Sequence, residues 1–160
     1  MKSFFAIGIL FSFILLSCRT QDELLVQEEI VTIKHGYTFG RCLGNCNKET
    51  TYTAGTMRYL QYSRDTLKNK PEMIEKKFTT ADFYALCKNI DLQAFLQLEE
   101  RLGCPDCADQ GAEYVEIITT NQKKRVTFEP GTIPAPLQTL LPKLRSNLTK
   151  LAASKKMEDK

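Results

Sequence analysis

The stretch that decides the fold is AEYVEIITTNQKKRVTFEP, residues 112–130. Its two halves are rich in β-branched and aromatic residues, which favour strands. Asn121-Gln122 between them is a two-residue connection, the length that joins the strands of a β-hairpin. In the second half Val126 and Phe128 alternate with polar residues, so we expect these two side chains to face a core. The stretch predicts an antiparallel hairpin with one buried side.

Further strands are predicted upstream of this hairpin. Residues 29–35 alternate as a strand, with Val31 and Ile33 on one side, and residues 36–46 form a loop with three glycines. Residues 48–64 are rich in Thr and Tyr and predict a second hairpin that turns at Ala54-Gly55. A polar loop ending at Pro71 precedes one more strand at 73–78.

Helical periodicity appears in two places. Residues 79–90 place apolar side chains three and four apart after a Thr79–Asp82 capping box, and Asp91 caps a second short helix that exits near Gly103. Leucines keep helical spacing from 137 to 151 across Pro142, which fits only the first turn of a helix. We therefore expect a 3₁₀ turn at 136–141 and a helix from Pro142 onward. This order predicts an α+β fold: an antiparallel sheet of five or six strands with helices packed on one face.

The N-terminal segment predicts export. Residues 1–17 carry Lys2 and then an apolar run at 4–16, which is too short to cross a membrane and has the length of a signal-peptide core. Leu15-Leu16-Ser17-Cys18 resembles the lipobox of bacterial lipoproteins. The resemblance implies that Cys18 becomes the lipidated N-terminus and carries fatty acids such as palmitate, and more than one acyl chain gives stable anchoring.

The predicted domain boundaries follow from this anchor. Residues 1–17 are the lipoprotein signal peptide, 18–28 the lipidated Cys and its tether, 29–153 a single α+β domain, and 154–160 a disordered tail. In enteric-type bacteria an Asp after the lipidated Cys retains a lipoprotein at the inner membrane, and here that position is Arg19. We expect a location in the outer membrane of the bacterial cell envelope, with the domain either on the periplasmic side or on the external side.

Composition argues against several classes of function. The formal net charge is +3 for 160 residues and becomes +2 when Lys2 leaves with the signal peptide, which is too small to indicate a nucleic-acid partner. His35 is the only histidine, so two-histidine metal sites within one chain are excluded. The sequence contains no G-x-S-x-G elbow, Walker or G-x-G-x-x-G motif. These features predict a protein that is not an enzyme and has no cofactor.

Four cysteines form two close pairs, Cys42 with Cys46 and Cys104 with Cys107. In an oxidising envelope, disulfides are the favoured interpretation, and four cysteines allow three connectivities. A Cys₄ zinc site is the second interpretation, because both spacings suit tetrahedral ligation. A redox dithiol at Cys104-Pro105-Asp106-Cys107 is the third, although a helix precedes this motif and the acidic Asp106 disfavours a thiolate.

A fifth cysteine and three acidic residues are minor candidate sites. Cys87 lies on the apolar side of its helix, so we expect a buried, unpaired small hydrophobe. Asp106, Asp109 and Glu113 offer oxygens that Ca²⁺ prefers, but their spacing is not that of an EF-hand. Turn and capping roles are the favoured interpretation for these acidic residues.

Two motifs resemble a family of small bacterial envelope lipoproteins that carry a domain of unknown function. The first is a C-x-G-x-C loop and the second is G-C-P-D-C-A-D-x-G-A-E, and the resemblance covers most of residues 30–150. The matching positions are Cys42, Gly44, Cys46, Gly103, Cys104, Pro105, Asp106, Cys107, Ala108, Asp109, Gly111, Ala112 and Glu113. Gln110 departs from the pattern, where Gly is expected, and a positive φ there would be strained. The resemblance implies fold and location but no reaction.

Three hypotheses about function follow. The preferred one is a non-enzymatic binding or scaffolding domain that is attached to the membrane by its lipid and has an envelope protein as its partner. The alternative is a thiol-active or zinc-dependent envelope enzyme that uses Cys104 and Cys107, alone or with Cys42 and Cys46. The third is a small inhibitor or immunity-like protein, which has the same size and anchor and no residue that distinguishes it.

Overall fold

The structure is a computed structural model that describes residues 29–65, 69–107 and 109–158. The predicted signal peptide, Cys18 and the tether up to residue 28 lie outside the described residues. The elements along the chain are β1 (Ile30–Thr38), β2 (Asn47–Tyr52), β3 (Thr56–Tyr62), β4 (Glu72–Lys77), α1 (Thr80–Cys87), α2 (Leu92–Leu96), β5 (Arg101–Leu102), β6 (Ala112–Thr119), β7 (Lys123–Phe128), the 3₁₀ helix η1 (Ala135–Leu137) and α3 (Leu141–Glu158).

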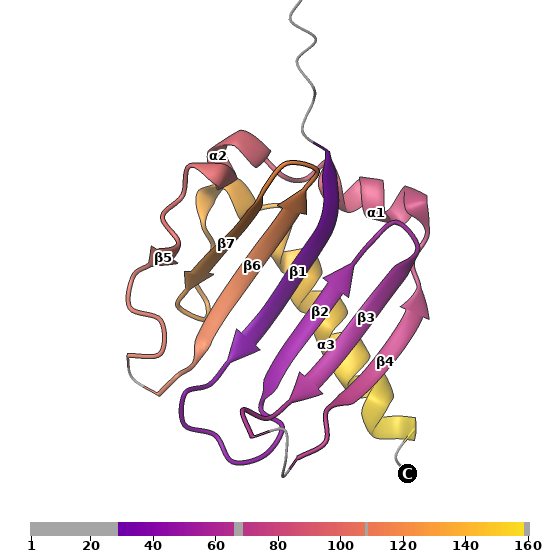
Figure 1. The fold of residues 1–160 in the computed structure, drawn as a ribbon, viewed down its shortest axis with the longest axis vertical. Coiled ribbons are helices and arrows are strands. Elements are labelled where there is room, and N and C mark those ends of the chain that lie inside the picture. Colours follow the sequence, from indigo (N-terminus) through magenta and orange to yellow (C-terminus); the bar gives the residue numbers. More distant parts are fainter. Residues whose placement is uncertain (1–28, 66–68, 108, 159–160) are drawn as a thin grey trace, which may run out of the picture.

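The strands form one sheet in the order β4-β3-β2-β1-β6-β7-β5 (Figure 1). All neighbouring pairs are antiparallel except β5 and β7, which run parallel. The α+β class and the mostly antiparallel sheet are confirmed, but the sheet has seven strands rather than five or six. The missed strand is β5, whose two residues are too few to show any periodicity. Its pairing extends back to Glu100, whose carbonyl accepts from the Thr127 N–H at 2.9 Å.

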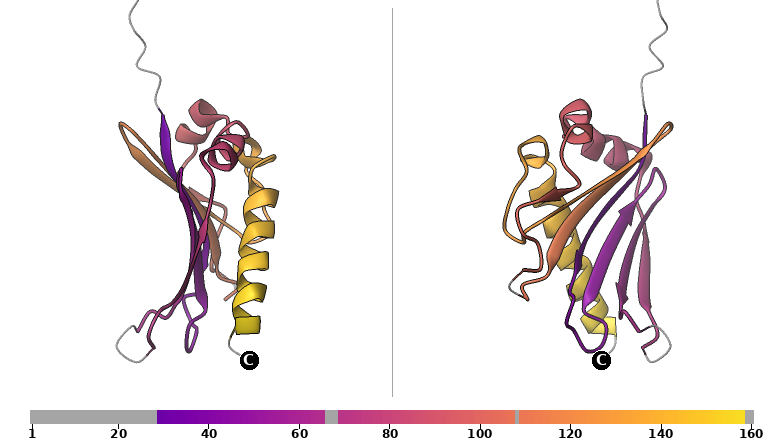
Figure 2. Two further views of the ribbon diagram at one scale, coloured as in Figure 1. Left: turned by 90° about the vertical axis from the view of Figure 1, so that its right-hand side faces the viewer. Right: turned by 60° about the vertical axis from the view of Figure 1, so that its left-hand side comes forward.

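Figure 2 shows α1, α2 and α3 on the same side of the sheet. The strand register explains which side chains meet them, because Tyr52, Ile33 and Ile117 stand in one row across β2, β1 and β6. All three are fully buried, as are Val126 and Phe128, which the sequence predicted to face inward. The strands also contribute Ile30 and Val115 to this core, and the three helices, with η1 and the link after it, contribute Phe83, Leu86, Phe95, Leu137, Leu140, Leu141 and Leu144.

Helix α3 crosses the sheet diagonally (Figure 1). Its C-terminal half forms a second, smaller apolar cluster with Tyr59 of β3. Its buried residues Leu141, Leu144, Leu148 and Leu151 recur at three and four, so one stripe of the helix is apolar. Pro142 lies in the first turn, as expected, because a proline there costs no intrahelical hydrogen bond. The helix continues to Glu158, into the segment 154–160 for which the sequence predicted a tail.

Both predicted helix caps are confirmed. The Thr79 hydroxyl accepts from the Asp82 N–H at 3.1 Å, and Asp91 accepts from the Ala94 N–H at 3.1 Å. The caps satisfy backbone donors that have no partner inside the helix. They fix the points where the chain leaves β4 for α1 and where α1 gives way to α2.

Two predictions about β1 are corrected. A register shift between Ile30 and Thr32 turns Ile30 into the core and leaves Val31 41% exposed, so Val31 does not share a side with Ile33. The strand also runs to Thr38 rather than ending before the predicted loop at Gly36. Gly36 lies opposite Tyr114, whose ring covers it so closely that a Cβ at position 36 would be 2.7 Å from the Tyr114 hydroxyl oxygen.

This close approach predicts that Gly36→Ala destabilises the fold. The added methyl would meet both Tyr114 and the backbone carbonyl of Lys48, which cannot move away without breaking the strand pairing. We expect a loss of about 2 kcal/mol in the free energy of unfolding, measured by urea denaturation. Gly55→Ala is the matched control, because a Cβ at that turn meets no atom within 4 Å. Equal effects at both positions would contradict the packing argument.

Candidate functional site

The two cysteine motifs lie at the same end of the sheet, opposite the end where β1 begins (Figure 1). Cys42 is bonded to Cys46, with 6.1 Å between their Cα atoms, and Cys104 to Cys107, with 5.5 Å. Both Cα separations lie in the usual range for a bridge. The structure agrees with the predicted disulfides. Of the three connectivities that the sequence left open, it has the one that joins each cysteine to its neighbour along the chain.

The two loops touch through residues that flank the cysteines. Arg41 and Asp109 approach to 3.9 Å, and Gly40 packs against the Asp106 carboxylate. Gly111 has a φ of +79° and lies under the ring of Phe39, where a side chain would not fit. The strain expected at Gln110 does not occur, because the positive φ falls on Asp109 instead, and Asp tolerates this conformation better than most residues.

A small cavity of about 190 Å³ lies beside the Cys104–Cys107 bridge. Glu129 lines it and accepts the Cys104 N–H at 2.8 Å, and Asp106 is another of the lining residues. Both bridge cysteines are exposed, so a thiol from solution can reach them. Two carboxyl groups at this site oppose formation of a thiolate, because like charges disfavour each other.

The described residues do not gather ligands for a metal ion. In the described parts of the chain, no three His, Cys, Asp or Glu side chains come together in a way that could hold one. Asp109 is exposed and faces Arg41, whereas Glu113 is fully buried and turned toward α3. The candidate Ca²⁺ residues therefore do not converge.

Glu113 is the centre of a buried polar cluster that the sequence analysis missed. Its carboxylate accepts from His35 Nε2 at 2.8 Å and from the Tyr37 hydroxyl at 2.8 Å, both on the neighbouring strand β1. From α3, the Arg145 guanidinium donates to both carboxylate oxygens, at 2.9 and 2.6 Å. Arg145 also donates to the Thr132 carbonyl at 2.8 Å, so the cluster connects the sheet, α3 and the segment before it.

The electrostatics of the cluster favour an ionised Glu113. Burial by itself raises the pKa of this carboxyl, but the hydrogen bonds from His35, Arg145 and Tyr37 outweigh it and leave the pKa below its usual range. The pKa of Arg145 is raised, chiefly by its hydrogen bonds to Glu113. Burial and the Glu113 bond raise the pKa of the Tyr37 hydroxyl, so it stays a donor. His35, the only histidine of the sequence, is hydrogen-bonded to this buried carboxylate.

A second polar network lies on the sheet face away from the helices. The Tyr114 hydroxyl donates to Glu49 at 2.6 Å, and the Arg125 guanidinium lies over the Tyr114 ring, 4.2 Å from its centre. Arg125 also donates to Glu116 at 2.8 Å, and Lys34 approaches the same carboxylate to 3.5 Å. The network, here called the open-face network, consists of Lys34, Glu49, Tyr114, Glu116 and Arg125 and holds these side chains in fixed positions.

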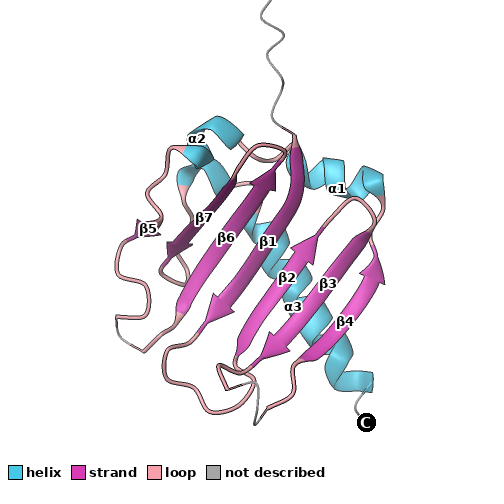
Figure 3. Ribbon diagram, in the orientation of Figure 1, coloured by secondary structure: helices cyan, strands magenta, loops and turns pink. Residues whose placement is uncertain are grey.

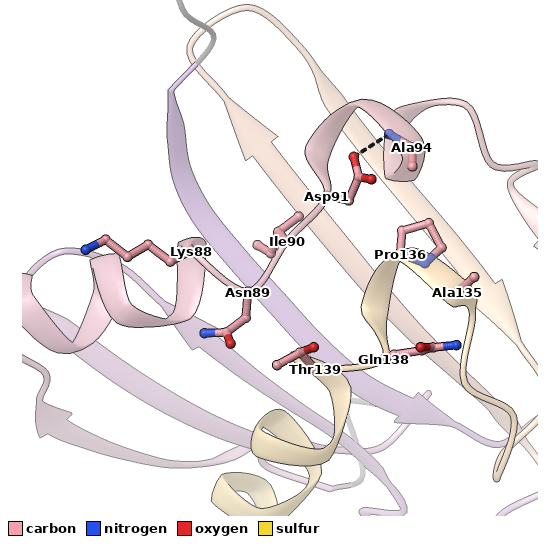
Figure 4. Close-up of a pocket in the computed structure, with 9 residues that line it drawn as sticks. All are labelled: Lys88, Asn89, Ile90, Asp91, Ala94, Ala135, Pro136, Gln138 and Thr139. Carbon is pink, nitrogen blue, oxygen red and sulfur yellow. Dashed lines mark hydrogen bonds between the residues drawn. The ribbon is translucent and has the colours of Figure 1, made fainter.

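A surface groove of about 560 Å³ separates the α1–α2 connection from η1 (Figure 4). Lys88, Asn89, Ile90 and Asp91 line one side, and Ala135, Pro136, Gln138 and Thr139 line the other. Its one carboxylate, Asp91, is occupied by the N–H that it caps. Apart from Lys88 and Asp91, the residues that line the groove are neutral.

No family model and no curated protein sequence matches this chain. Within the described ranges, no helix has the length and apolar character needed to cross a membrane.

Glu113→Gln is expected to lower the free energy of unfolding at pH 7 by about 3–5 kcal/mol, because it leaves Arg145 without its buried counter-charge. Urea denaturation measures the loss. Glu75→Gln on the exposed strand β4 is the control, with an expected change within about 0.5 kcal/mol. A loss below about 1 kcal/mol at Glu113 would mean that the cluster does not hold α3 to the sheet.

The same variant tests the pH dependence. Because the folded pKa of Glu113 is depressed, its contribution is complete above the unfolded pKa, near 4.5, and is lost as the pH falls through the folded value. The stability difference between wild type and Glu113→Gln is therefore expected to be constant from neutral pH to about pH 5 and to shrink in more acid solution. A difference that grows on acidification would contradict the ionised state.

Peptide mapping without reduction is expected to find Cys42 linked to Cys46 and Cys104 linked to Cys107. Among the described residues Cys87 is the one free cysteine, and burial raises its pKa to about 11, so its alkylation near pH 8 is expected only after denaturation. It is partly rather than fully buried, which corrects the sequence expectation.

Each loop closed by a disulfide is short, so removing one bridge is expected to lower the free energy of unfolding by about 2 kcal/mol in the chain-entropy model. A peptide joining Cys42 or Cys46 to Cys104 or Cys107 would contradict the local pairing.

Proposed function

We propose that this chain is a lipoprotein of the bacterial cell envelope, anchored through Cys18, whose folded domain binds or scaffolds another envelope protein. The lipobox at residues 15–18 supports the anchor, and Arg19 after it favours the outer membrane. On this proposal the lipid attaches the protein to the membrane, and the domain has a protein partner and no nucleic-acid ligand. The resemblance to small envelope lipoproteins supports the same location.

The observation that carries the binding role is the difference between the two faces of the sheet. The helices lie on one face (Figure 2) and the core is built there. The other face carries the open-face network, which lies outside the apolar core and is held in place by charge-assisted hydrogen bonds. A polar surface that is ordered before binding loses little conformational entropy when a partner docks.

The buried cluster supports a binding role over catalysis. His35, the only histidine, is fully buried and bonded to Glu113, and Glu113 in turn is saturated by Tyr37 and Arg145. Groups engaged in this way hold the fold together and do not face a substrate. Their removal is expected to change stability first.

A thiol-active role is the second candidate, because the Cys104–Cys107 bridge is exposed and borders a cavity. The acidic Glu129 and Asp106 beside it work against this role by disfavouring the thiolate. Cys104→Ser separates the two. Loss of a disulfide reductase or isomerase activity with stability retained would favour the enzyme, whereas loss of stability alone favours a structural bridge.

Fractionation of cells expressing the full chain tests the anchor. We expect wild type in the membrane fraction, released by detergent and labelled by an alkynyl palmitate analogue, and Cys18→Ala in the soluble envelope fraction. Cys87→Ala is the matched control, since it removes the other unpaired cysteine without touching the lipobox. A Cys18→Ala protein that remains in membranes would contradict the lipoprotein.

Photo-crosslinking tests the binding face. A crosslinker at Arg58, exposed on the open face of β3, is expected to capture a discrete envelope protein. The same crosslinker at Thr149, exposed on α3, is the control and is expected to capture none. Capture from Thr149 alone would place the partner on the helix side and contradict the role of the open face.

A further inference from the structure

The two edges of the sheet differ in length. One edge ends in β5, which has two residues, and the other in β4, which has six and so offers about 20 Å of edge. β4 is last in the sheet order, so its outer side pairs with no strand of the described chain (Figure 1). Met73 in its middle is 59% exposed, and Glu75, Lys76 and Lys77 are exposed as well.

Charged residues at an edge usually discourage pairing with other chains, and β4 has three of them exposed. In β4, however, the charges are arranged so that the strand complements itself. An antiparallel partner reads the strand backwards, and residues that lie opposite each other point to the same face. For two identical strands related by a two-fold axis, the axis must therefore pass midway between one residue and its own copy, and the register is named here by that residue.

Only one such register pairs opposite charges without setting like charges opposite each other. With the axis at Ile74, Glu72 lies opposite Lys76 of the second copy and Lys76 opposite its Glu72, while Met73 lies opposite Glu75. With the axis at Lys76, Glu75 would meet Lys77, but Lys76 would face its own copy, and with the axis at Glu75 two glutamates would face each other; like charges in such positions are destabilising. With the axis at Met73, no opposite charges meet. The alternation of charge along EMIEKK thus selects Ile74.

We propose that a second copy of this chain pairs with β4 in this register, so that two sheets join into one. The two-fold axis is perpendicular to the sheet, so both sets of helices stay on one face and the two open faces become continuous. Ile74 belongs to the cluster of Tyr59, Leu148 and Leu151, so the apolar core of one copy continues toward that of the other.

The pairing of two copies extends the proposed scaffolding role. It depends on that proposal only for the attachment of both copies to a membrane. The axis turns the Ile30 ends of the two copies in opposite directions along the sheet, so both anchors reach one membrane when the joined sheet lies along its surface. Residues 19–29 span up to about 36–40 Å when extended, which sets the largest distance between each Ile30 and its anchor.

Cysteine crosslinking of the full chain tests the pairing. In membranes from cells expressing Ile74→Cys on a Cys87→Ser background, oxidation with copper phenanthroline is expected to give a disulfide-linked dimer, since position 74 faces its own copy. Met73→Cys is the matched control: it is more exposed, but it faces Glu75 and is expected to give little dimer. Equal dimer from both, or none from Ile74→Cys, would overturn the register.

Charge exchange provides the second arm. Glu72→Lys or Lys76→Glu alone turns two attractive pairs into repulsive ones and is expected to lower the dimer yield of Ile74→Cys about tenfold. The double variant Glu72→Lys/Lys76→Glu restores both pairs and is expected to recover the yield. Unchanged yield in the single variants, or a crosslink from position 74 to a different protein, would overturn self-pairing. Fractionation of the same variants reports separately on the lipid anchor.

Discussion

The fold depends on one buried carboxylate. Glu113 stands on β6 among apolar side chains, and it is stable there because three donors from two other elements saturate it. A buried charge with this many partners fixes geometry as well as energy, since each partner must be in place for the others to be satisfied. The angle at which α3 crosses the sheet and the register between β1 and β6 are therefore coupled through a single side chain.

The two faces of the sheet use polar groups for different purposes. On the helix side, the cluster around Glu113 replaces apolar packing at the point where Arg145 reaches down from α3. On the open side, the Tyr114 ring covers Gly36 and supports Arg125, so an aromatic residue shields a backbone that would otherwise be bare. Both arrangements begin in the same short segment, Glu113-Tyr114, whose two side chains point in opposite directions because they are neighbours on a strand.

The sequence predicted the elements that carry a strong period or a cap. The β6–β7 hairpin, the Thr79 and Asp91 caps and the entry of Pro142 into α3 depend on local chemistry and are found where expected. β5 and the shift at Val31 could not be predicted, because both come from pairing with distant strands. The Glu113 cluster left a signal that was overlooked: Glu113, Val115 and Ile117 alternate, which puts a carboxylate on the apolar side of its strand. Its partners His35, Tyr37 and Arg145, however, lie 78, 76 and 32 residues away, and no local pattern indicates them.

The local pairing of the cysteines has a consequence for biogenesis. Each bridge closes a loop of three or four positions and joins no two distant parts of the chain. The core can form before, during or after oxidation, and each cysteine finds its partner as its nearest neighbour along the chain. Such a chain has little need of an isomerase to correct wrong pairings. Reduction of the bridges would loosen the loops at this end of the sheet without unfolding the core.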